Sequence, residues 1–251
     1  SDVYKRQALG EHPDAKVVAF VHAETSTGVC SDVATLCAVA KEAGCLTIVD
    51  TVTGLGGVEL RVDDWQVDVA YSGTQKCLSC PPGISLITYS DAAAARVKAR
   101  NTPVQSWFMD LSLLMAYWEG EGARTYHHPA PVNAMYGLHE ALLMLHEEGL
   151  EHAWQRHSDM HQLLVEGLEE LGLELVVDPS YRLPQLNVVA APPGVNEAEV
   201  RKALLERYNL EIGAGLGVFA GKVWRIGLMG YAARQENVLL CVNALRSCLP
   251  G

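Results

Sequence analysis

Short apolar runs rich in β-branched residues alternate with amphipathic stretches along the first part of the chain. The apolar runs read KVVAFVH, CLTIVD, VDVAYSG and ISLITYS, and the helical pattern SDVATLCAVAKEAG lies between the first two. This alternation predicts an α/β fold in which crossover units build a mostly parallel sheet with helices over its faces. Ser31 or Asp32 is expected to cap the first helix, and Gly44 to end it.

Polar loops follow three of these predicted strands, at residues 22–28, 50–57 and 72–83. In open α/β sheets, ligands bind beyond the carboxyl ends of the strands, where the chain leaves its apolar cover. We therefore expect the three loops to converge on one site.

The pattern changes beyond the last of these strands. Apolar residues recur at helical spacing over residues 132–148 and 150–171, which Gly149 separates. Helices are also expected over residues 197–208 and 233–249, between shorter strand-like runs. The second half of the chain therefore predicts two bridging helices followed by a small α+β domain.

These patterns divide the chain into a large domain, residues 8–155, and a small C-terminal domain, residues 156–251. The boundary falls within the second bridging helix. Residues 1–7, SDVYKRQ, show no periodicity, and we interpret them as an expression or sequence-assembly scar outside the fold.

Composition narrows the classes of partner. The net charge of −11 without clusters of Lys or Arg argues against nucleic acid and against an anionic membrane surface, so small molecules are the expected partners. No apolar run approaches the roughly 18 residues that a membrane span needs, and no secretory signal begins the sequence. Seven scattered cysteines predict a reducing, intracellular and most simply cytoplasmic setting, with organelle targeting left open.

Asp50 and Lys76 are the first candidates for chemistry, because each stands where a predicted strand gives way to a loop. A buried, unpaired carboxylate costs several kcal/mol, so a plain Asp50–Lys76 ion pair is one interpretation. The other is that both bind pyridoxal 5′-phosphate (PLP), which needs an amine for an imine linkage and a carboxylate to keep its ring nitrogen protonated. Thr25, Ser26 and Thr27 are then placed to bond the ring oxygen or the phosphate.

Five strings carry a more specific pattern: HAETSTGV, IVDTVTGLGGVEL, DVAYSGTQKCLSCPPGISLITYSDAA, YHHPAPVNAMYGLHEAL and GKVWRIGLMG. Together they resemble the class V, fold-type I PLP-dependent aminotransferases, most closely the alanine–glyoxylate and serine–pyruvate aminotransferases. The resemblance runs from about Lys16 to the C-terminal helix. It implies transamination between a small amino acid, alanine or serine, and a 2-oxo acid such as glyoxylate or pyruvate.

The resemblance also assigns residues within the large domain. It implies that Lys76 forms the Schiff base with the cofactor and moves the substrate proton. Asp50 is expected to pair with the pyridinium nitrogen, and Val52 to pack against one ring face. Thr25 is expected to reach the ring hydroxyl, and Gln75 the phosphate.

Arg225 and Tyr126 are assigned in the same way. Arg225, in the strand-like run KVWRIG, matches the arginine that holds the substrate carboxylate, and its forked guanidinium suits a carboxylate; the alternative is an arginine snorkelling from an edge strand. Tyr126 matches a residue that contacts the phosphate in the partner subunit, which implies a homodimer with composite sites. Pro129 stands where the family commonly has threonine, and this puts one cross-subunit phosphate bond in question.

Other motifs give weaker evidence for a functional site. Cys77 and Cys80 form a CxxC pair without a second ligand pair, and the adjacent His127 and His128 lack further ligands at a suitable spacing. The G-x-G-x-x-A match that begins at Gly215 precedes a strand-like run rather than the helix a dinucleotide site needs. No metal site is predicted.

Two rival functions stay open. A cysteine desulfurase or another class V lyase shares the fold, but desulfurases need a mobile cysteine, and Cys241 and Cys248 fall in a predicted helix. They also usually have histidine where this chain has Gln75. A non-catalytic scaffold is the other rival, and the presence of Lys76, Asp50 and Arg225 argues against it.

The start of the chain departs from the family pattern. Members carry a glycine-rich phosphate-binding turn and an aromatic residue that stacks on the cofactor, and residues 1–15 resemble neither. We therefore expect that roughly the first third of a complete enzyme is missing, so that the large domain is incomplete and the chain alone binds PLP weakly.

Overall fold

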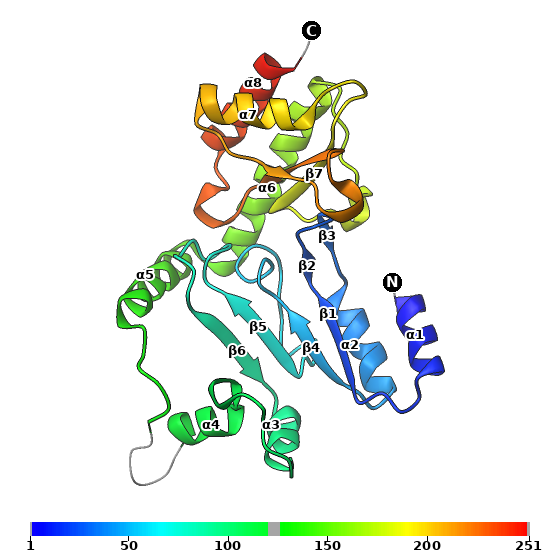
Figure 1. Cartoon of the computed structure of the whole chain (residues 1–251), viewed down its shortest axis with the longest axis vertical. Helices are drawn as coiled ribbons and strands as arrows, with labels where there is room; N and C mark the ends of the chain where they lie inside the picture. The colour runs from blue at the N-terminus through cyan, green and yellow to red at the C-terminus, as the bar shows by residue number, and fades with distance from the viewer. Residues whose placement is uncertain (1, 120–125, 250–251) are drawn as a thin grey trace.

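The computed structural model describes residues 2–119 and 126–249. Figure 1 shows two parts, one above the other: a lower part built on a four-stranded sheet and an upper part with a three-stranded sheet and its helices. Helix α6 (Leu150–Glu170) runs from the lower part into the upper one (Figure 1). The predicted boundary at residues 155 and 156 falls inside this continuous helix, and the division into domains stays a prediction.

The large sheet confirms the expected α/β arrangement. Its strands are β1 (Val17–Val21), β4 (Leu46–Asp50), β5 (Val69–Gly73) and β6 (Ser85–Tyr89). They lie in the order β1-β4-β5-β6, with the first two pairs parallel and the last antiparallel. A short ribbon of β2 (Ala23–Glu24) and β3 (Val29–Cys30) follows β1.

Helix α2 (Val33–Glu42) covers one face of this sheet. Asp32 is its N-cap and accepts a hydrogen bond from the backbone N–H of Thr35 at 3.0 Å. Gly44 follows the last turn with φ +71°, a conformation that suits glycine. The buried core between helix and sheet contains Val33, Cys37, Val49, Val67 and Ala70.

The opposite face of the sheet is only partly covered. Side chains alternate along a strand, so Leu46 and Ile48 point away from α2. They border a groove of about 1080 Å³, whose other wall comes from α3 (Asp91–Lys98), the start of α4 (Leu111–Glu119) and the loop between them. The sequence predicted helices over the faces of the sheet. In the described part of the chain, one face is fully covered and the other only partly.

Helix α1 (Asp2–Glu11) occupies most of the segment without periodicity. It lies beside α2, and Arg6 pairs with Glu42 across the two helices. Leu9 packs at the edge of a small core, and no residue of α1 is fully buried, which explains the missing apolar pattern. The segment is thus helical from Asp2 onward, Ser1 lies outside the described residues, and its interpretation as a scar stays a prediction.

The later helices begin and end close to the predicted positions. After the one-turn helix η1 (Trp107–Met109), the bridging helices are α5 (Val132–Glu148) and α6. Gly149 separates them with φ +87°. None of the helices in the described ranges is long and apolar enough to cross a membrane.

The upper part is the predicted α+β unit. Its antiparallel sheet has the order β7-β9-β8, from β7 (Leu186–Ala190), β8 (Gly213–Ala214) and β9 (Val223–Gly227). Helices α7 (Glu197–Tyr208) and α8 (Gln235–Cys248) and the one-turn helices η2 (Pro179–Tyr181), η3 (Gly217–Phe219) and η4 (Gly230–Ala232) complete it. Its core centres on Trp224, which is fully buried and joins side chains of α6 and α8.

Candidate active site

Three strand ends meet at one edge of the large sheet. In the parallel register Asp50 lies opposite Val21 on β1 and Tyr71 on β5. The backbone N–H of His22 donates to the carbonyl of Asp50 at 2.9 Å, and the N–H of Thr51 donates to that of Tyr71 at 2.9 Å. The loops that follow these strands therefore start side by side, as the sequence predicted.

Asp50 ends β4 with a carboxylate that is stabilised by neutral donors. Its Oδ1 accepts from the backbone N–H of Val52 at 2.9 Å, and its Oδ2 accepts from the Tyr71 hydroxyl at 2.8 Å. The same hydrogen bond, together with burial, raises the pKa of Tyr71. No ion pair joins Asp50 to Lys76 in the described chain, so the plain ion-pair interpretation of these two residues is wrong.

The loop after β5 is folded on itself around Lys76. The N–H of Ser79 donates to the carbonyl of Lys76 at 3.0 Å, and the N–H of Cys80 donates to that of Thr74 at 3.0 Å. Lys76 is half-buried, and its amine makes no hydrogen bond or ion pair with any residue in the described ranges. The loop backbone thus fixes the position of Lys76. Its amine, which has no partner in the described ranges, is available to a ligand.

Arg225 joins the upper part to the loop after β1. From β9, its Nη1 donates to the carbonyl of Thr25 at 3.0 Å and its Nε donates to that of Ala214 at 2.6 Å. The remaining Nη2 has no partner among the described residues. The structure thus brings Arg225 and Thr25 together, with one donor of the guanidinium still open to a carboxylate.

Val52 and Gln75 lie next to the residues already described. Val52 is half-buried two residues after Asp50, and Gln75 is exposed directly before Lys76. A Cβ added at Gly73 would lie 2.5 Å from the Gln75 Oε1, so the side-chain amide of Gln75 folds back over Gly73. Their contacts with a cofactor stay predictions.

Tyr126 belongs to another part of the chain. Its ring meets that of Tyr117 of α4 edge-on, with centroids 6.2 Å apart, and it is exposed. Helix α4 lies at the lower end of the sheet in Figure 1, away from the upper part. This chain therefore does not bring Tyr126 to the three loops, and its role in a partner subunit stays a prediction.

The cysteine and histidine pairs have partners of their own. The buried Cys77 thiol donates to the carbonyl of Thr53 at 3.4 Å, and burial raises its pKa to about 12, so it is un-ionised at neutral pH. The Cys80 thiol donates to the Gly137 carbonyl of α5. His127 is buried and stacks on Trp107 with centroids 4.1 Å apart. In the described ranges no group of three or more His, Cys, Asp or Glu is arranged to hold a metal ion.

Two residues near these loops were missed by the sequence analysis. Tyr71 binds Asp50, and the fully buried Gln185 donates from its Nε2 to the carbonyl of Thr53 at 2.8 Å. Tyr71 lies within the predicted strand VDVAYSG, but that run does not reveal the register that sets Tyr71 opposite Asp50. Gln185 carries no signal either, because it stands 132 residues from its partner.

The free groups of this site fit PLP. Within residues 2–119 and 126–249, the Asp50 carboxylate at the sheet edge has no cation beside it, the Lys76 amine in the neighbouring loop has no partner, and the Arg225 guanidinium of β9 has one open donor. A ring nitrogen, an aldehyde and a substrate carboxylate are the groups that these three would recognise.

Comparison with known proteins gives one consistent family. A family model described as Aminotransferase class-V matches residues 6–239. Over 97% of its length the chain is 40% identical to the alanine–glyoxylate aminotransferase of Callithrix jacchus. Over 93% of its length it is 38% identical to the (S)-ureidoglycine–glyoxylate transaminase of Bacillus subtilis. It spans 59% and 60%, respectively, of the lengths of these two relatives.

Solved structures agree. The alanine–glyoxylate aminotransferase from Nostoc sp. superposes with a TM-score of 0.94 at 46% identity, covering 98% of this chain and 64% of that one. The pyridoxamine–pyruvate aminotransferase from Mesorhizobium loti gives a TM-score of 0.90 at 28% identity, covering 99% and 63%. Class V aminotransferases are generally PLP-dependent. The chain belongs to the class V aminotransferase family, within the fold-type I group.

Proposed function

We propose that this chain takes part in PLP-dependent transamination between a small amino acid, alanine or serine, and a 2-oxo acid such as glyoxylate or pyruvate. The observation that carries the proposal is that the Asp50 carboxylate and the Lys76 amine, which has no partner among the described residues, follow the ends of adjacent strands. The relatives support the substrate class, since those from Callithrix jacchus and Bacillus subtilis are named for glyoxylate and that from Mesorhizobium loti for pyruvate.

Several residues would hold the cofactor. Asp50 would accept from the protonated ring nitrogen, with its carboxylate kept in place by Val52 and Tyr71. Thr25 would bond the ring hydroxyl, and Gln75 the phosphate. When bound, PLP supplies the electron sink that makes the α-proton of an amino acid acidic.

Lys76 and Arg225 would act on the substrate. The Lys76 amine would act as a positioned general base and then as a general acid. It would take the proton from the substrate Cα and deliver it to the carbon on the other side of the amino nitrogen. Arg225 would hold the substrate carboxylate with Nη2, because Nε and Nη1 are already bound to main-chain carbonyls. These two contacts orient the Cα–H bond toward the base.

Substitution of the lysine tests the proposal. Lys76→Ala should lower the rate of transamination between alanine and glyoxylate by more than about 100-fold, since a positioned acid–base typically contributes 10²–10⁴. Lys222→Ala, which removes an exposed lysine of the upper part, is the matched control and should keep the rate. Transamination by Lys76→Ala at the wild-type rate contradicts the proposal, and sulfide release from free cysteine as the faster reaction would favour the desulfurase alternative.

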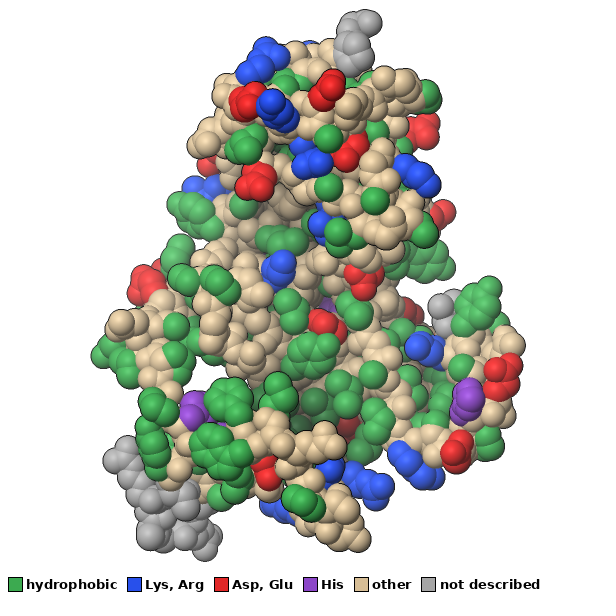
Figure 2. Space-filling view, in the orientation of Figure 1, with side chains coloured by type: hydrophobic (Ala, Val, Ile, Leu, Met, Phe, Trp, Pro, Cys, Tyr) green, Lys and Arg blue, Asp and Glu red, His purple; other side chains and the backbone are tan. Residues whose placement is uncertain are grey.

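We further propose that the working form is a homodimer in which Tyr126 serves the site of the partner subunit. Helix α5 supports this, because none of its residues is buried although it is largely apolar. Figure 2 shows hydrophobic side chains gathered over α4 and α5. The exposed apolar residues of these helices include Leu113, Trp118, Val132, Met135, Tyr136, Leu142, Leu143 and Met144.

A further inference from the structure

The turn after β9 presses against the loop that carries Lys76. The N–H of Tyr231 donates to the Ser79 hydroxyl at 2.8 Å. Gly230 has φ +55°, and a Cβ placed on it would lie 2.1 Å from the Ser79 Oγ and 2.5 Å from the carbonyl oxygen of Cys77. Only glycine allows this approach, since any side chain would overlap the backbone of the lysine loop.

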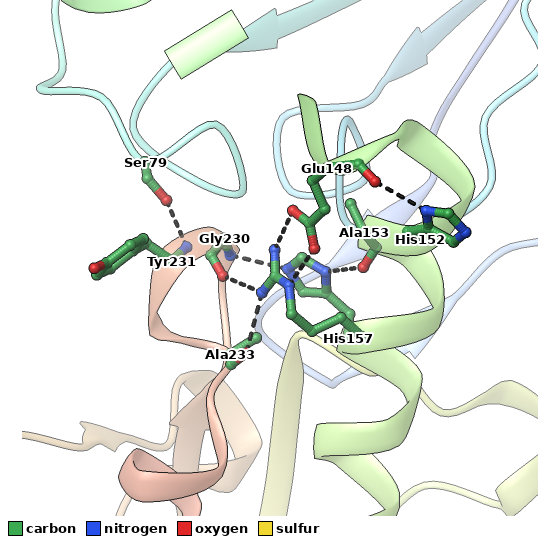
Figure 3. Close-up of polar contacts among 9 residues, drawn as sticks. Ser79, Glu148, His152, Ala153, His157, Gly230, Tyr231 and Ala233 are labelled. Carbon is green, nitrogen blue, oxygen red and sulfur yellow. Dashed lines mark hydrogen bonds and ion pairs between the residues drawn. The ribbon is translucent and has the colours of Figure 1, made fainter. Parts of the chain in front are cut away.

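The other side of this turn is bound to helix α6. The Nη1 of Arg156 donates to the carbonyls of Gly230 at 2.8 Å and Ala233 at 3.0 Å. Figure 3 labels both of these turn residues. The other two nitrogens of the guanidinium make a forked ion pair with Glu148, the last residue of α5. One side chain thus satisfies two turn carbonyls, and a carboxylate holds it in place.

His157 adds a second anchor from the next position on α6. Its ring is fully buried, and its Nε2 accepts from the N–H of Gly230 at 2.9 Å. Its Nδ1 lies 2.6 Å from the carbonyl of Ala153, to which it donates as the neutral tautomer (Figure 3). Both backbone polar groups of Gly230 are therefore fixed by α6.

The same turn continues directly from the strand of the substrate arginine. Gly230 is five residues beyond Arg225, and the N–H of Leu228 between them donates to the carbonyl of Gln185 at 2.9 Å. A movement of the turn is therefore passed to β9 on one side and to the Lys76 loop on the other.

We propose that Arg156 and Ser79 are positioning residues that fix the turn at residues 230–233, and through it set the placement of Arg225 relative to Lys76. The consequence for substrate binding rests on the function proposed above; the mechanical coupling does not. Loss of either residue should let β9 and the lysine loop move independently, which weakens the grip on the substrate carboxylate more than it slows the chemistry.

Two glycine variants test the close approach of Gly230 to the lysine loop. Gly230→Ala and Gly217→Ala strain nearly the same backbone conformation, at φ +55° and +56°, but a Cβ at Gly217 meets nothing within 4 Å. We expect Gly230→Ala to raise the KM for alanine about tenfold, the size of a lost hydrogen bond, with kcat changed less than about twofold. Gly217→Ala should leave both constants unchanged. Equal effects of the two variants would overturn the proposal.

Amide hydrogen exchange tests the coupling without any turnover. Arg156→Gln should speed exchange at the amides of Ser79 and Cys80 at least about fivefold, although Arg156 bonds neither residue, because those amides rely on a loop that the turn holds. Ser79→Ala should do the same at Tyr231. Exchange that rises only within the turn and α6 contradicts the coupling and leaves Arg156 a merely structural residue.

The two readouts separate the two proposals. Faster exchange at the lysine loop in a protein that shows no transaminase activity supports the coupling and contradicts the proposed function. Arg156→Lys is the conservative variant: its ammonium can still donate to the carbonyls of the turn, so it should restore slow exchange at Ser79 in large part. An unchanged KM together with unchanged exchange in Arg156→Gln would falsify the positioning role.

Discussion

Two surfaces around the large sheet differ in how their side chains and loops find partners. Toward the upper part, each loop of the site has a directional hydrogen bond: Thr25 with Arg225, Thr53 with Gln185, and Ser79 with Tyr231. Toward α4 and α5, large apolar side chains stand exposed instead, as Figure 2 shows.

The difference concerns where each surface finds its partner. Hydrogen bonds with defined geometry fix the first surface within the chain, so the site loops and the upper part hold one another. Exposed apolar surface of this extent is typical of protein contact sites, and it supports a partner from outside the chain, for which we propose a second copy. Three predictions test this comparison, from the largest expected effect on stability to the smallest.

The largest effect should come from the core of the upper part. Trp224 is fully buried, and its Nε1 donates to the carbonyl of Glu197 at 3.1 Å. Trp224→Ala should lower the free energy of unfolding by about 3–5 kcal/mol, from lost burial and the cavity left behind. Trp118→Ala on α4, where the side chain is 54% exposed, should cost about 1 kcal/mol or less. Urea unfolding measures both, and similar losses would mean that the two surfaces do not differ.

The second effect is a loss of folding stability at acidic pH. Burial lowers the pKa of His22, beside the site loops, to about 4. In the unfolded chain this ring binds a proton below pH 6.5 or so, so the folded state should lose stability as the pH falls from about 6.5 to about 4. The loss from this group should approach about 3 kcal/mol.

Removal of the ring should flatten that dependence. In His22→Leu the fall in the free energy of unfolding between pH 7 and pH 4 should be smaller than in the wild type by most of this amount. Urea unfolding at a series of pH values measures it. Parallel curves for the two proteins would show that burial of His22 is not coupled to its protonation.

The smallest effect on the folded chain should come from the exposed apolar surface. Tyr136 on α5 and Tyr4 on α1 are 72% and 73% exposed, so Tyr136→Glu and Tyr4→Glu should each change the free energy of unfolding of the separated chain by about 0.5 kcal/mol or less. Only Tyr136→Glu should convert a dimer into a monomer in sedimentation, because it places a charge in the proposed interface. A wild-type monomer, or a dimer that survives this variant, would contradict the proposed homodimer.

Local signals explain what the sequence predicted well. The apolar spacing of residues 132–148 and 197–208 gave α5 and α7 with the observed ends, and Asp32 was named as a possible cap of α2. These features depend on neighbours within about four positions, so a single sequence contains them. Helix α1 was missed because it is held against α2 by few side chains and has no buried face of its own.

The candidate site was predictable only in part. Asp50, Lys76 and Arg225 were found from their positions at strand ends and within matching strings, but their hydrogen-bond partners were not. The carboxylate of Asp50 is bound by Tyr71 rather than by Lys76, a result of strand register that no local pattern encodes. The same holds for the turn at Gly230, which approaches Cys77 across more than 150 positions of the chain.

The order of apolar and polar residues alone determined the α/β alternation, the helix ends and the identity of the groups able to do chemistry, because periodicity and side-chain type are properties of the sequence. Only the tertiary structure decided that Arg156 of α6 binds the turn after β9 and that this turn rests on the lysine loop. The reason is physical: hydrogen bonds between distant segments exist only once packing has brought their donors and acceptors within about 3 Å.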